Sequence, residues 1–143
     1  MAAVVNVPLY TVEILRLAAS LPEPEALERV DGVSEVRSHT CGSIVRTQVS
    51  LGANGKIEDI SQRVQACAFG QASAFLVGSH AVGRSAEDVQ GAMAALSAWL
   101  NGVGEIPEWP GVAALAPARS RTARHAAILL PFRALLSAIE ERK

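Results

Sequence analysis

Cysteine is scarce in this sequence, which has two among 143 residues. Small domains held together by disulfide bonds are rich in cysteine, so a disulfide framework is not expected. Residues 1–8 are apolar but lack the basic region of a secretory signal, and no apolar run is long enough to span a bilayer. We therefore expect a cytoplasmic protein without a membrane segment, in which both thiols are reduced.

The sequence also has few aromatic residues and almost no net charge. Aromatics make up 4% of the chain and the net charge is −1, whereas half of the residues are hydrophobic. Ala, Leu and Val must therefore fill most of the core, and the lack of a basic excess argues against nucleic-acid binding. A chain of this length can bury roughly 70% of its unfolded surface, so we expect residues 1–143 to form one domain.

The hydrophobic pattern predicts strands in the middle of the chain and helices on either side. Residues 44–51 alternate between apolar and polar side chains, which is typical of a strand with one buried face. Further strands are expected over residues 33–40 and 56–65, the latter irregular enough to suggest a bulge. Helices are expected over residues 10–21, 69–80, 85–100 and 123–141.

Turn and cap residues support these boundaries and predict the topology. Gly52-Ala53-Asn54-Gly55 favours a tight turn, and Ser85 to Asp88 is similar to a capping box at the start of a helix. Short connections between three strands indicate an antiparallel meander. We therefore predict an α+β fold, with a three-stranded antiparallel sheet and with the N-terminal helix and the C-terminal helices packed on one face.

The two cysteines stand at strand ends. Cys41 comes just before the second predicted strand, and Cys67 lies between the third strand and the following helix. In a meander these two ends can lie close together, and a helix N-terminus stabilises a thiolate through its free amides. The alternative is that the two are unrelated buried thiols, because free cysteine behaves as a small hydrophobic residue.

The order strand, Cys-Gly, strand, turn, strand, Cys and Ala-rich helix resembles the NifU/IscU/SufU family of iron–sulfur cluster assembly scaffolds. The resemblance extends over about residues 9–140, so it covers nearly the whole chain. The segments that carry it are residues 41–43, 67–74, 83–88 and 127–132. No single motif is specific to the family, but their order and spacing together are.

The resemblance implies a scaffold that binds iron, an iron–sulfur cluster or zinc, is not an enzyme, and has a cysteine desulfurase as its partner. Cys41 and Cys67 match the first two cysteines of the family. The family's aspartate is replaced by Ser43 and its third cysteine by Ala127, with Ala126 before it. Two thiolates alone make a weak site, because zinc sites and iron–sulfur clusters usually have four protein ligands.

Two histidines are candidates for the missing metal ligands. His39 lies two residues before Cys41, and on an extended strand His39, Cys41 and Ser43 would share one face. His125 lies two residues before Ala127, which turns it about 200° away on a regular helix. The alternatives are an exposed histidine at a strand end for His39 and a surface histidine beside neighbouring arginines for His125.

Three functions remain open on the sequence. The first is a scaffold or metal carrier whose ligand set is completed by a histidine, water, a small thiol or a second copy of the chain, as a homodimer. The second is a persulfide acceptor for a cysteine desulfurase, which needs only one exposed thiolate. The third is a metal-free adaptor. Metal content separates the first from the third, and persulfide formation on one cysteine tests the second.

Overall fold

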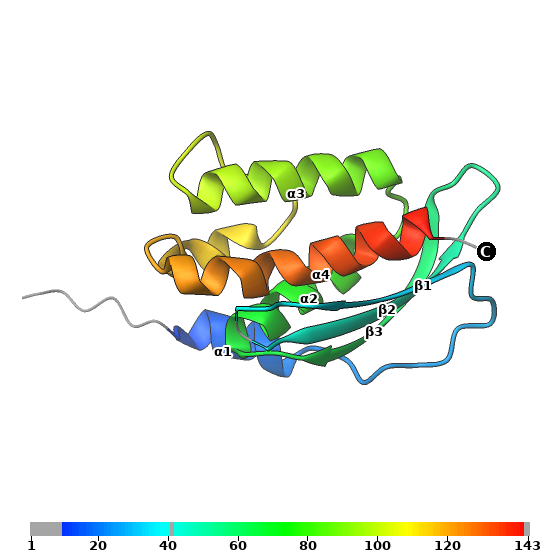
Figure 1. Cartoon of the computed structure of the whole chain (residues 1–143), viewed down its shortest axis with the longest axis horizontal. Helices are drawn as coiled ribbons and strands as arrows, with labels where there is room; N and C mark the ends of the chain where they lie inside the picture. Colours follow the sequence, from blue (N-terminus) through cyan, green and yellow to red (C-terminus); the bar gives the residue numbers. More distant parts are fainter. Residues whose placement is uncertain (1–9, 41, 142–143) are drawn as a thin grey trace, which may run out of the picture.

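The computed structural model describes residues 10–40 and 42–141 of the chain. Within these residues a helix comes first, a three-stranded sheet follows, and the remaining helices complete the fold (Figure 1). In chain order the elements are α1 (Val12–Ala19), β1 (Gly32–Arg37), β2 (Ile44–Leu51), β3 (Ile57–Gln65), α2 (Ala68–His80), α3 (Ala86–Leu100), the 3-10 helix η1 (Val112–Ala118) and α4 (Thr122–Glu140).

The predicted α+β fold is confirmed. The sheet is antiparallel with the strand order β1-β2-β3, as expected for a meander. The bulge expected in the third strand is also present, because Ser50 pairs with Asp59 and Leu51 pairs with Ile57, which leaves Glu58 without an opposite residue. None of the described helices is long and apolar enough to cross a membrane.

The helices cover one face of the sheet in two layers. α2 packs on β3, and α4 packs on β1 and β2, while α1 packs on α2 and α3 packs on α4. Figure 1 shows α3 separated from the sheet by α4. Alternate residues of the central strand β2 form the middle of the sheet side of the core, and Ile57 of β3 adds to it. The inward residues of β2 are Val45, Thr47, Val49 and Leu51.

Side chains fix where two of the helices begin. The Thr11 hydroxyl accepts a hydrogen bond from the Ile14 amide at 3.1 Å, at the start of α1. The predicted capping box of α3 is present: Ser85 Oγ accepts from the Asp88 amide at 3.2 Å, and Asp88 Oδ2 accepts from the Ser85 amide at 3.0 Å. The hydrogen bonds around Asp88 lower the pKa of its carboxyl group.

The approach of α4 to the edge strand β1 depends on Gly32. A Cβ atom at position 32 would lie 1.9 Å from the Ala138 carbonyl oxygen of α4, which is far inside contact distance. The Ser34 hydroxyl on the same strand donates to the Ala134 carbonyl at 2.5 Å. The backbone of α4 therefore lies directly against β1, and only glycine fits at position 32 without moving one of the two elements.

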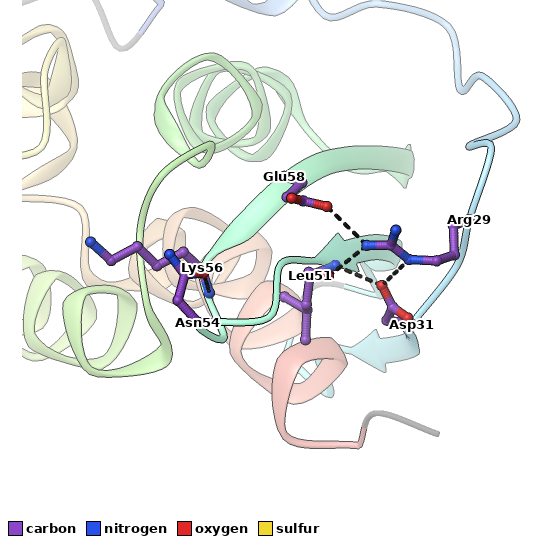
Figure 2. Close-up of polar contacts among 6 residues, drawn as sticks. All are labelled: Arg29, Asp31, Leu51, Asn54, Lys56 and Glu58. Atoms are coloured by element: carbon purple, nitrogen blue, oxygen red, sulfur yellow. Dashed lines mark hydrogen bonds and ion pairs between the residues drawn. The ribbon is translucent and has the colours of Figure 1, made fainter.

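A polar cluster joins the coil before β1 to the C-terminal end of β2, far from the β1–β2 turn (Figure 2). Arg29 donates to Asp31, to Glu58 and to the Leu51 carbonyl at 2.9, 2.9 and 2.6 Å. Asp31 in turn accepts from the Leu51 amide at 2.7 Å. These bonds from Leu51 and then Arg29 hold the pKa of the Asp31 carboxyl below its ordinary value.

The connection between α3 and α4 contains structure that the sequence did not predict. η1 follows Gly111, whose φ of 88° is in the left-handed region. Trp109 just before it is buried, donates from Nε1 to the Leu76 carbonyl at 2.8 Å, and meets Phe132 edge to face. The Arg84 guanidinium lies over the indole ring of Trp109, with its central carbon 4.0 Å from the ring centroid.

Replacing Gly32 by alanine is expected to lower the free energy of unfolding by about 1–3 kcal/mol, because the added methyl group forces α4 and β1 apart. The measurement is urea unfolding of both forms. Gly91→Ala is the matched control, since a Cβ there meets no atom within 4 Å inside helix α3. That control should gain roughly 0.5–1 kcal/mol. Equal stability of Gly32→Ala and the wild type would contradict the packing described for α4.

Replacing Asp31 by asparagine should lower the thermal unfolding midpoint at neutral pH, because the ionised carboxylate holds Arg29 and the Leu51 amide. The folded-state pKa of Asp31 lies below its ordinary value of 3.8. Its contribution is therefore present above that value and is lost as the pH falls through the folded-state pKa. The difference between the two proteins should shrink on acidification below about pH 4. Glu105→Gln, on an exposed loop, is the control and should leave the midpoint at neutral pH unchanged.

Candidate functional site

The strand register brings two connections to the same end of the sheet. Arg37, the last residue of β1, pairs with Ile44, the first residue of β2, and Ile44 pairs with Gln65, the last residue of β3. The β1–β2 turn and the junction between β3 and α2 therefore leave the sheet side by side. We call this the cysteine end, because the chain carries Cys67 in the junction and Cys41 between the two strands.

Cys67 connects β3 to the buried helix α2. It is the N-cap residue of α2, with φ −66° and ψ 173°, and its carbonyl accepts a hydrogen bond from the Gln71 amide at 2.9 Å. Its thiol is free and half-buried, and it makes no capping hydrogen bond. The helix therefore starts at a free cysteine that is partly exposed and that also packs against the hydrophobic core.

The other side of the cysteine end is the β1–β2 turn. The Ser38 amide donates to the Ser43 carbonyl at 2.8 Å, and the Gly42 amide donates to the Ser38 carbonyl at 3.0 Å. Gly42 has a φ of 72°, which favours glycine. The predicted site residue Cys41 lies outside the described residues, between Thr40 and Gly42.

The expectation that His39 and Ser43 share a strand face is wrong. β1 ends at Arg37 rather than at Thr40, so His39 lies in the turn and the two-residue repeat of a strand does not apply to it. His39 is exposed, whereas Ser43 is buried. The hydrogen bonds that close the turn around Ser38 end the strand three residues earlier than predicted.

His125 is buried, so the alternative that it is a surface histidine is wrong. Its side chain is 8% exposed, and Nε2 lies 3.0 Å from the Ala118 carbonyl oxygen and 3.1 Å from that of Arg119. These contacts face the end of η1. The structure therefore directs Nε2 of His125 toward the end of η1.

Acidic and histidine ligands do not gather around the described cysteine. Among residues 10–40 and 42–141 there is no group of three or more His, Cys, Asp and Glu side chains that can hold a metal ion.

Comparisons with known proteins place this arrangement in a family. No family model matches the chain, and no curated protein matches it. Among solved structures, the N-terminal part of a nitrogen-fixing NifU-like protein from Brucella abortus is 31% identical, with a TM-score of 0.86 over 93% of each chain. The chain belongs to the NifU/IscU/SufU family.

Two further structures share the fold at lower identity. A candidate iron–sulfur cluster assembly scaffold protein for the SUF system from Fervidobacterium islandicum has a TM-score of 0.80 and 21% identity, over 92% of this chain and 96% of its own. A hypothetical protein has a TM-score of 0.70 and 22% identity, over 90% of this chain and 94% of its own.

The family's third cysteine corresponds to Ala127 in the resemblance, and Ala127 faces the start of α2. A Cβ atom added at Gly70 would lie 2.6 Å from the Ala66 Cβ, 3.4 Å from the Ala127 carbonyl oxygen and 3.7 Å from the Ala127 Cβ. One turn further along α2, the Ser73 hydroxyl donates to the Ile128 carbonyl at 2.5 Å. α4 therefore packs tightly against the segment that carries Cys67, with Ala127 at the contact.

Gly70 is the residue of this site that sequence reasoning missed. It lies in the first turn of α2, where glycine weakens a helix, and a glycine in an otherwise alanine-rich helical segment often marks a close approach. A Cβ there would collide with the Ala66 Cβ, so the missing side chain lets the chain turn from Ala66 into α2, and the glycine itself was the available signal.

Proposed function

We propose that this protein is an assembly scaffold that holds iron, an iron–sulfur cluster or zinc as cargo through Cys41 and Cys67. The observation that carries the proposal is the strand register, which sets the β3–α2 junction with its half-buried Cys67 beside the turn between β1 and β2. Membership of the NifU/IscU/SufU family supports it, because the Fervidobacterium islandicum neighbour with the same fold is named as such a scaffold.

The chemistry of the cysteine end suits a soft metal. Thiolate sulfur is the preferred ligand of iron–sulfur clusters and a common ligand of zinc. Cys67 is the N-cap residue of α2 and uses no side-chain hydrogen bond there, so its sulfur is not committed to capping the helix. The half-exposed position leaves room for cargo to enter and leave, as a carrier requires.

Two thiolates leave the usual set of four ligands incomplete. His39 is the preferred histidine, because it is exposed and precedes Cys41 by two residues in the sequence. His125 would first have to give up its contacts with the Ala118 and Arg119 carbonyls. A homodimer is the other solution, since two cysteines from each of two chains supply four thiolates for a bridging cluster.

In the proposed role the protein is a carrier and not an enzyme. It acts in the cytoplasm, and residues 1–143 form a single domain. Sulfur would then come from a cysteine desulfurase, which is the partner that the family resemblance implies. Persulfide found on Cys67 after incubation with a desulfurase and cysteine would instead support the sulfur-acceptor function.

Metal and acid-labile sulfide in anaerobically purified protein test the proposal. The wild type should carry near-stoichiometric iron with sulfide, or zinc, and Cys41→Ser and Cys67→Ser should each lose most of it, because the loss of either thiolate leaves one sulfur ligand. His39→Gln should lower the metal content, whereas His125→Gln should not. Light scattering with and without metal shows whether the cargo bridges two chains.

A gain-of-ligand variant sharpens this experiment. Ala127→Cys adds a thiol at the contact between α4 and the start of α2, so it should raise affinity for cobalt(II), whose thiolate charge-transfer absorption reports bound sulfur.

Wild-type protein that stays metal-free after reconstitution would refute the carrier proposal and leave the adaptor function. Metal that remains in both cysteine variants would show that other groups bind it.

A further inference from the structure

Three arginines lie together on the face of the sheet that the helices leave open. Arg37, Arg46 and Arg63 are exposed, and each alternates with inward-facing residues on its strand. The register places Arg46 of β2 directly opposite Arg63 of β3. Arg37 of β1 pairs with Ile44 and is therefore a diagonal neighbour of Arg46. We call these three residues the arginine row.

Within the described part of the chain, the arginine row has no ion-pair partner. The two ion pairs found there both belong to Arg29, at the opposite end of the sheet. Glu35 is directly opposite Arg46 in the register but does not reach it as an ion pair. Like charges placed directly opposite on neighbouring strands are destabilising. Arg46 and Arg63 are thus a like-charged pair that forms no ion pair with a described carboxylate, although Glu35 stands opposite Arg46 and Glu25 lies nearby on the coil.

A groove of about 210 Å³ opens between this pair and the coil before β1. Its walls are Arg46, Gln48, Ser61 and Arg63 on the sheet, and Pro24, Glu25 and Ala26 on the coil, so one carboxylate of the chain itself also lines the groove. The Glu25 amide donates to the Ser61 hydroxyl at 3.1 Å, which fixes the coil against β3. The groove is wide enough for a carboxylate side chain, and amide, hydroxyl and guanidinium groups line its sheet side.

We propose that the arginine row is a docking surface for an acidic segment of a partner protein, with one of its carboxylates held between Arg46 and Arg63. Guanidinium groups bind carboxylates through paired, charge-assisted hydrogen bonds, which relieves the repulsion between the two arginines. The proposal stands on these residues and does not require Cys41 or Cys67 to bind metal.

The position of the row favours a protein over a free anion. Arg37 lies in the terminal register row with Ile44 and Gln65, and Cys67 follows Gln65 by two residues. A protein seated on the row therefore extends to the cysteine end, which a free anion bound between Arg46 and Arg63 does not reach. A nucleic acid is disfavoured because the chain as a whole carries a net charge of −1 and would repel an extended polyanion.

NMR titration of the full-length, metal-free protein tests the proposal. The probe is an octapeptide of alternating glutamate and glycine, added to ¹⁵N-labelled protein. Shifts are expected at the backbone amides of β2 and β3 and at the side-chain Nε of Arg46 and Arg63. The double variant Arg46→Gln/Arg63→Gln should weaken binding by about tenfold or more. Its thermal midpoint should not fall, because a repelling pair has been removed.

The matched control removes the same charge elsewhere. Arg121 and Arg133 are exposed on α4 or just before it, and Arg121→Gln/Arg133→Gln should keep the wild-type affinity. The proposal is overturned if both double variants lose affinity equally, if the wild type does not bind, or if a glutamine–glycine octapeptide gives the same shifts. Inorganic phosphate or single-stranded DNA that binds the row as tightly as the acidic peptide would also overturn it.

Discussion

The antiparallel register of β1, β2 and β3 is the constraint on which the rest of the structure depends. Because Arg37, Ile44 and Gln65 share one row, the turn after β1 and the helix after β3 must leave the sheet together. The same register turns alternate residues of each strand toward α2 and α4 and the others outward. The proposed cargo site at one end of the sheet and the arginine row on its open face are therefore consequences of a single pairing pattern.

Two glycines permit close contacts within this frame. Gly32 allows the backbone of α4 to touch β1, and a larger side chain there would separate the two elements. Gly70 leaves room for Ala66 at the start of α2, where α4 lies in contact through Ala127. α4 thus spans the molecule between the two contacts, and Ala127 occupies the position where the family resemblance expects a third cysteine.

Local patterns in the sequence were enough to predict much of the fold. The alternation in β2, the turn at residues 52–55 and the cap at Ser85 are all properties of neighbouring residues, and each was read correctly. The end of β1 was misjudged because hydrogen bonds across the turn at Ser38 terminate the strand. The burial of His125 was missed for a similar reason. Its partners are the carbonyls of Ala118 and Arg119 at the end of η1, and no short sequence pattern reveals the packing that holds this helix in place.

Proximity of the two thiols is the central claim, and dibromobimane tests it most directly because this reagent fluoresces when it bridges two neighbouring thiols. Folded, reduced wild-type protein should become fluorescent, whereas Cys41→Ser and Cys67→Ser should not. Denatured wild type should react more weakly, since the register no longer holds the thiols together. If folded wild type shows no bridging, although iodoacetamide alkylates both cysteines singly, then the sheet does not bring Cys41 and Cys67 together and the account fails.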